Sequence, residues 1–190
     1  MNGMVRIFVA ALLLSTSLAM AQNPANTIEG IVTFSALRAS PPAGSCGCFW
    51  MPGGTGEFAF PMWGSLSGVL EVSGQRTGNI SGSNVGLSLV SGMGGLRMRV
   101  PVRSRFQPYG QVLFGGVHAF DSYFPASAGR AAATSDSSFV MTVGGGLDVA
   151  MSPYVLIRVV QADYYYSQLR ELQGDRQHQV RLSAGIVFRR

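Results

Sequence analysis

The chain has 190 residues, enough for one domain of ordinary size, and only 12% of them are charged, against ~25% in soluble domains. It contains 25 glycines and carries a formal net charge of +5. Its basic residues are scattered rather than clustered, which argues against a nucleic-acid interface. The composition therefore favours a protein that needs no charged coat against water.

The N-terminal segment has the features of a secretory signal peptide. Arg6 supplies a positive charge, residues 7–18 form a short apolar run, and residues 19–21 read Ala-Met-Ala, which suits cleavage by a signal peptidase. The run is too short for a transmembrane helix. We therefore expect a signal peptide at 1–21 and a single domain at 22–190.

Alternation of apolar and polar residues dominates the rest of the chain and predicts β-strands. In the last segment, every second residue from Val180 to Phe188 is apolar, while Arg181 and Ser183 share the opposite face. Eight such strands are expected, at 28–36, 57–62, 66–75, 84–100, 106–118, 138–151, 154–166 and 180–188. The glycines at 92–95 are expected to form a bulge that keeps or resets the phase of the alternation.

The predicted connections alternate between short and long. Short links are expected at 63–65, 101–105 and 152–153, and long ones at 38–56, 75–83, 119–137 and 167–179. This is the pattern of outer-membrane barrels, in which an even number of strands brings both termini to the short-turn end. We predict an all-β fold, an eight-stranded antiparallel up-and-down transmembrane β-barrel.

A soluble lipocalin-like barrel or sandwich is the alternative, and it requires the apolar faces to point inward. The polar faces contain few charges for a water-exposed coat, which favours the membrane barrel. Aromatic residues near the strand ends suit interfacial girdles. They are Trp63, Phe106, Tyr109, Tyr123, Phe124, Tyr154 and Phe188.

Four segments carry a resemblance to a known family. They read RFQPYGQVLFGG at 105–116, GGGLDV at 144–149, RVVQADY at 158–164 and VRLSAGIVF at 180–188. The mature chain resembles the small eight-stranded outer-membrane barrels similar to the transmembrane domain of outer membrane protein A. The resemblance implies a bacterial outer membrane, with outer-membrane lipid, lipopolysaccharide and the barrel-assembly machinery as partners. Many relatives end on an aromatic residue, whereas Arg189 and Arg190 follow Phe188 here.

Two cysteines, Cys46 and Cys48, lie in the first predicted long loop. An exported chain meets an oxidising compartment, which favours a disulfide between them, although so small a ring is geometrically tight. Free or intermolecular thiols are the second interpretation. A metal site with His118 and His178 is the third, and it needs more ligands than the cysteines supply.

The sequence contains no arrangement typical of an enzyme. Its two histidines have no nucleophile and acid at recognisable spacings. The glycines at 144–146, like those at 92–95, lack the helix and lysine of a phosphate-binding loop. We expect no catalytic residues, no cofactor and no metal.

Charged residues at inward phases of the predicted strands are the most informative polar positions. An eight-stranded barrel is just wide enough for side chains to fill, and buried charges must pair. We expect a luminal charge network of Glu29, Glu71, Arg97, Asp148, Arg158, Asp163 and Arg181. A gated ion path along the same charges is the alternative.

Simple alternation in the seventh strand would place Gln161 and Asp163 on the apolar face with Val159. A lipid-facing charge at the bilayer centre costs a few kcal/mol. We therefore predict a one-residue bulge at Val159 or Val160, which turns Gln161 and Asp163 inward together with Arg158.

The expected function is that of an integral outer-membrane barrel with a structural or surface-interaction role and no enzymatic activity. A narrow ion-conducting channel is one alternative. A surface adhesin or ligand-binding barrel, which would use the long loops, is the other.

Overall fold

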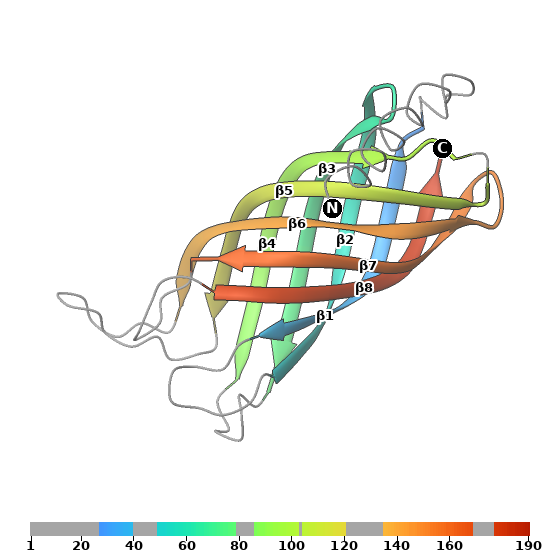
Figure 1. The fold of residues 1–190 in the computed structure, drawn as a ribbon. Coiled ribbons are helices and arrows are strands. Elements are labelled where there is room, and N and C mark those ends of the chain that lie inside the picture. The colour runs from blue at the N-terminus through green and yellow to red at the C-terminus, as the bar shows by residue number, and fades with distance from the viewer. Residues whose placement is uncertain (1–26, 40–48, 79–85, 103, 121–134, 169–176) are drawn as a thin grey trace, which may run out of the picture.

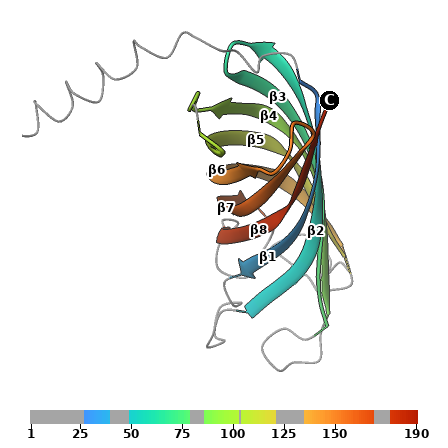
Figure 2. The same ribbon diagram turned by 90° about the vertical axis from the view of Figure 1, so that its right-hand side faces the viewer.

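The computed structural model describes residues 27–39, 49–78, 86–102, 104–120, 135–168 and 177–190. They form eight strands: β1 (Glu29–Ala39), β2 (Phe49–Trp63), β3 (Leu66–Thr77), β4 (Leu87–Arg99), β5 (Phe106–Phe120), β6 (Asp136–Ala150), β7 (Val155–Ser167) and β8 (Gln177–Arg189). Each strand is antiparallel to the next, and β8 pairs with β1 to close a barrel (Figures 1 and 2). The predicted fold class is confirmed. The described residues include no helix long and apolar enough to cross a membrane.

Both ends of the described chain meet at the end of the barrel that carries the short connections. The amide of Ile28 donates to the carbonyl of Arg190 at 2.9 Å, and the Arg190 amide donates back to Ile28. Figure 1 shows the C-terminus at this end, which we call the short-turn end. Gly64, with a φ of 57°, closes the β2–β3 turn in a conformation that favours glycine. The opposite end is called the loop end.

Strand β2 is much longer than the predicted 57–62, because it already begins at Phe49. Pro52, Gly53 and Gly54 are typical of a loop, yet here they continue the strand and pair with β1. A Cβ at Gly53 would overlap the backbone of the neighbouring β3 strand. Glycine is therefore needed for close approach inside this strand, and the predicted loop at 38–56 was too long.

The predicted bulge in β4 was wrong, because the pairing of β4 with β3 and β5 runs unbroken through Gly92 to Gly95. Leu89 faces the lumen, whereas Leu96 and Met98 are exposed on the outer face. The apolar residues change face because the lumen itself is apolar near the loop end. No change of backbone phase is involved.

The predicted bulge in β7 is confirmed. Leu147 pairs with Val160 and Asp148 with Arg158, which leaves Val159 as the extra residue. Val159 and Val160 are both exposed, whereas Arg158 is completely buried. The extra residue lets Gln161 and Asp163 face the lumen beyond it, where both are buried.

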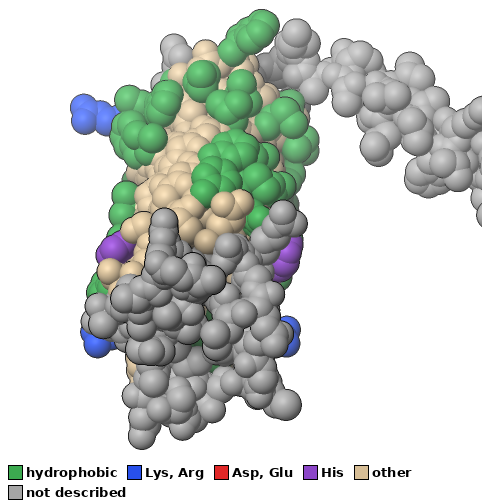
Figure 3. Space-filling model, turned by 90° about the vertical axis from the view of Figure 1, so that its left-hand side faces the viewer, with side chains coloured by type: hydrophobic (Ala, Val, Ile, Leu, Met, Phe, Trp, Pro, Cys, Tyr) green, Lys and Arg blue, Asp and Glu red, His purple; other side chains and the backbone are tan. Residues whose placement is uncertain are grey.

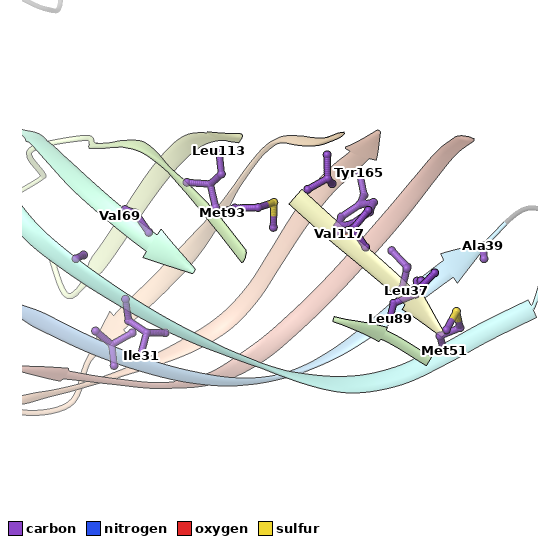
Figure 4. Close-up of a cluster of buried hydrophobic side chains, with 14 of the residues drawn as sticks. Ile31, Leu37, Ala39, Met51, Val69, Leu89, Met93, Leu113, Val117 and Tyr165 are labelled. Carbon is purple, nitrogen blue, oxygen red and sulfur yellow. The ribbon is translucent and has the colours of Figure 1, made fainter. Parts of the chain in front are cut away.

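An apolar layer fills the lumen near the loop end. Leu37 and Met51 are register partners on β1 and β2, and both are completely buried. Figure 4 shows them in the cluster of buried apolar side chains together with Leu89 from β4. Val117 and Val140, near the loop ends of β5 and β6, belong to the same cluster. These side chains fill the lumen between the charged network and the loop end.

The outer face of the barrel carries many exposed apolar side chains, and Figure 3 shows some of them in green on one face. Val32 is 64% and Phe34 66% exposed, and similar residues follow on every strand. Apolar patches of such extent are not stable against water, whereas a closed barrel satisfies its backbone within lipid. The barrel is therefore membrane-spanning, and the soluble alternative was wrong.

Aromatic side chains surround the short-turn end, as expected for an interfacial girdle. Trp63, Phe106, Tyr154 and Phe188 are all exposed there. Tyr109 was wrongly assigned to this girdle, because its side chain is buried in the lumen. Tyr123 and Phe124 lie outside the described residues.

Candidate functional site

The lumen contains a balanced set of charges. Five arginines and five carboxylates of the described strands point inward: Arg97, Arg99, Arg158, Arg181, Arg189, Glu29, Glu57, Glu71, Asp148 and Asp163. Because their formal charges cancel, the interior is neutral as a whole, although most of these groups are buried and only Arg99 and Arg189 among the ten are partly exposed.

At the short-turn end, the carboxylate of Glu29 joins two arginines from different sides of the barrel. Arg189 of β8, the strand next to β1, donates to Glu29 Oε1 at 2.8 Å. Arg99 of β4 reaches across the lumen to Glu29 Oε2 at 2.6 Å and to Asp148 at 3.1 Å. The amide oxygen of Gln107 accepts from both arginines. These contacts connect β1, β4, β5, β6 and β8.

Arg158 lies at the centre of the network. Its Nε donates to Asp148 on the adjacent β6 strand at 2.9 Å, and its Nη1 donates to Glu57 on β2 at 2.9 Å. Glu57 also accepts from Arg97 of β4, and Arg97 in turn donates to Gln111 of β5 at 2.6 Å. Each charged group therefore has partners of opposite sign or an amide oxygen, as buried charges require.

Tyr109 contributes an aromatic ring to this cluster. The guanidinium carbons of Arg97 and Arg158 lie 4.7 and 4.6 Å from the centre of the ring, within the range of cation–π attraction. Its hydroxyl donates to Gln161 Oε1 at 2.7 Å. Gln161 also accepts from Arg158 and donates to Asp163, so it connects the central cluster to the next one.

Arg181 of β8 forms the third part of the network. It makes two hydrogen bonds to Glu71 on β3, at 2.5 and 2.8 Å, which is the bidentate geometry preferred by guanidinium and carboxylate groups. It also donates to Asp163 on the neighbouring β7 strand at 2.9 Å. The pair with Glu71 spans the lumen and connects residues 110 positions apart in sequence.

The three central arginines have almost no contact with solvent. Arg158 and Arg181 are 0% exposed and Arg97 is 1% exposed. A conducting lumen would leave solvent in contact with its charged lining. In this conformation the network fills the barrel instead of lining a pore.

All seven charged residues selected from the sequence face the lumen and are buried there. Glu29 pairs with Arg189 and Arg99, whereas Arg181 pairs across the lumen with Glu71. Sequence reasoning missed Glu57, Arg99 and Arg189. Alternation gave the signal for Glu57, which lies between outward-facing residues of β2. Arg189 continues the inward phase of β8, although it was left out of the expected network.

The two histidines lie on the outer face, on different strands. His118 of β5 shares a 2.7 Å hydrogen bond with Ser137 of β6. His178 of β8 shares one with the Tyr164 hydroxyl of β7. The described residues contain no group of three or more side chains able to hold a metal ion. Cys46 and Cys48, like the expected signal peptide, lie outside the described residues.

Comparison with solved structures identifies the same architecture. Neisserial surface protein A superposes with a TM-score of 0.59 at 15% identity, covering 88% of this chain and 98% of that one. Ail, the attachment invasion locus protein of Yersinia pestis, gives 0.54 at 15% identity over 87% of this chain and 99% of that one. OprG, an outer membrane protein from Pseudomonas aeruginosa, gives 0.55 at 12% identity over 88% and 97%.

No protein-family model matches the chain, and no curated protein matches it in sequence. The structural likeness extends over nearly the whole described barrel and confirms the resemblance at the level of the fold. The chain has the fold of the small eight-stranded outer-membrane barrels.

Proposed function

We propose that this chain is an integral protein of the bacterial outer membrane with a structural or surface-interaction role and no enzymatic activity. The observation that supports this role best is the filled lumen, in which five arginines and five carboxylates neutralise one another. A closed interior makes the barrel a rigid element of the envelope and leaves its outer surface and loops for interactions. The apolar outer face supports the membrane location.

A narrow ion channel is the less favoured role. A channel would need the central pairs to separate, because Arg97, Arg158 and Arg181 now block the lumen without solvent contact. Separation would leave buried charges unpaired, at a cost of several kcal/mol for each pair. The apolar layer around Leu37 and Met51 adds a second barrier near the loop end.

An adhesin-like role is compatible with the same closed barrel. Ail, which shares the fold, is an attachment invasion locus protein, and it has also been solved with the heparin analogue sucrose octasulfate. On this chain such a role would belong to the long connections at the loop end. Exchange of these loops, followed by measurement of binding to host or matrix surfaces, tests it.

Two measurements test the main proposal. Fractionation of membranes should recover the protein with the outer membrane, and unheated samples should migrate differently from boiled ones in a denaturing gel. A soluble periplasmic protein with a single migration position would contradict the membrane location. Stable single-channel steps in planar bilayers would instead favour the ion-channel function over the structural role.

A further inference from the structure

The charged side chains of the barrel are divided unequally between its two faces. Most described carboxylates are buried in the lumen and paired there. Asp136 is half-buried at the start of β6, opposite the buried Ala119, and also has an interaction partner. Arg38 and Arg76 remain exposed near the loop end, and Arg105 and Arg190 at the short-turn end. Figure 3 shows arginine and histidine side chains on one outer face, with no acidic side chain among the described atoms. The outer face is thus cationic at both ends.

Near the loop end, one of these arginines lies on the same outer surface as several aromatic rings and one imidazole ring. We call this surface the Arg38 patch, and it consists of Arg38 (β1), Trp50 (β2), Tyr164 and Tyr166 (β7), and His178 (β8). All five belong to the outer face. Trp50 is 49% and Tyr164 44% exposed, so the patch is open to the surroundings of the barrel.

The pairing of the strands makes the patch continuous. Arg38 pairs directly with Trp50 on one side and with Val180 on the other. His178 precedes Val180 by two residues on the same face, so it is a diagonal neighbour of Arg38, a relation that is within the reach of long and aromatic side chains. His178 pairs with Tyr166, and the two ring centres are 5.4 Å apart.

The imidazole of His178 is held in position by its neighbours. The Tyr164 hydroxyl shares a hydrogen bond with Nδ1, and the Tyr164 ring centre lies 5.8 Å away. The ring is therefore held by two tyrosines near the loop end of the barrel. A ring held in this way can contribute to a binding site without a large loss of side-chain entropy.

We propose that the Arg38 patch binds the phosphorylated sugar headgroup of an outer-leaflet glycolipid of the lipopolysaccharide type. A guanidinium binds phosphate through paired, charge-assisted hydrogen bonds, and nothing acidic on β1, β2, β7 or β8 faces outward to oppose it among the described residues. Tyrosine and tryptophan supply flat apolar faces with polar edges, which suit a sugar at the membrane interface. This inference rests on the proposed outer-membrane location.

Binding to the purified, micelle-embedded barrel tests the patch independently of that location. The probes are bis-phosphorylated lipid A, the same lipid without phosphates, and phosphatidylglycerol. Native mass spectrometry measures the apparent Kd of each. The variants are Arg38→Gln, Trp50→Leu and, as a matched control at the opposite end, Arg105→Gln. Each must first show the heat-modifiable migration of a folded barrel.

Loss of the charge-assisted hydrogen bonds should weaken lipid A binding about tenfold or more in Arg38→Gln. Removal of the lipid phosphates should weaken binding to the unchanged protein to a similar degree, and Trp50→Leu should weaken binding even if Arg38→Gln does not fold. Arg105→Gln should bind like the unchanged protein. Equal weakening in Arg105→Gln, no weakening in the patch variants, or phosphatidylglycerol binding as tight as lipid A would overturn the proposal. A failed fractionation with intact lipid A binding would contradict only the location.

Discussion

The ring of Tyr109 occupies the space that a side chain at position 146 would need. Tyr109 and Gly146 are register partners on β5 and β6. A Cβ built on Gly146 would lie 2.6 Å from the Tyr109 hydroxyl oxygen and 2.9 Å from the ring carbon that carries it. Because position 146 is a glycine, the ring of Tyr109 can lie between Arg97 and Arg158.

Substitution of Gly146 by alanine should destabilise the barrel by roughly 1–3 kcal/mol, the usual cost of overpacking. The added methyl group must displace Tyr109 or the backbone of β7. Urea unfolding, followed by the heat-modifiable gel shift, measures the change. Gly92→Ala is the control, because a Cβ at that strand position meets nothing within 4 Å. Equal destabilisation in the two variants would argue against a specific role for the Tyr109 space.

Replacement of Arg158 by methionine should lower stability by roughly 3–5 kcal/mol, because Asp148 and Glu57 each lose a charged partner in the buried interior. The temperature at which the folded band disappears on gels should fall accordingly. Arg105→Met, at an exposed turn position, should leave that temperature nearly unchanged. If both variants melt alike and the Arg158 variant changes conductance in planar bilayers, the charges line a path instead of filling the lumen.

The Glu71–Arg181 pair should show strong energetic coupling. Glu71→Leu and Arg181→Leu each leave a buried charge without its bidentate partner, so each single change should be strongly destabilising. The double variant removes both charges and should lose less than the sum of the two, with a coupling energy of about 0.5–3 kcal/mol. A double-mutant cycle by urea unfolding measures it. Simple additivity would mean that the pair contributes no interaction of its own.

Deletion of Val159 should still give a folded barrel with a stability close to that of Val159→Ala. The deletion removes the extra residue between Arg158 and Gln161, and simple alternation then places Val160 outward while Arg158, Gln161 and Asp163 all remain in the inward phase. The fraction of protein with heat-modifiable migration after refolding measures the effect. A deletion variant that fails to refold while Val159→Ala refolds would show that the bulge has a role beyond restoring the phase of β7.

The sequence was most informative where one face of a strand met lipid. There, every second residue had to be apolar, and the alternation in β6 and β8 was sufficient to assign both faces. The Val159 bulge could also be predicted, because the charge of Asp163 made unbroken alternation too costly. The same alternation also identified the charged residues that face inward, because they occupy the face opposite the apolar residues.

The sequence-based predictions were wrong at two kinds of position: where apolar residues face the lumen, and where a glycine lies inside a strand. Leu89 and Leu96 have similar chemistry but face opposite sides, so the pattern alone suggested a bulge that does not exist. Gly53 was assigned to a loop because glycine beside proline is typical of loops. Its actual role, to allow the close approach of β3, becomes visible only in the folded barrel. The pairing of Arg181 with Glu71 depends on side-chain reach across the lumen, which strand order does not specify.

The order of luminal charges along the chain has a consequence for assembly. The first three strands contribute only carboxylates to the network, from Glu29, Glu57 and Glu71, whereas Arg158 and Arg181 arrive with the last two strands. An incomplete barrel would therefore hold an excess of negative charge that cannot enter lipid cheaply. The interior therefore becomes neutral only when β8, which carries Arg181 and Arg189, joins the other seven strands.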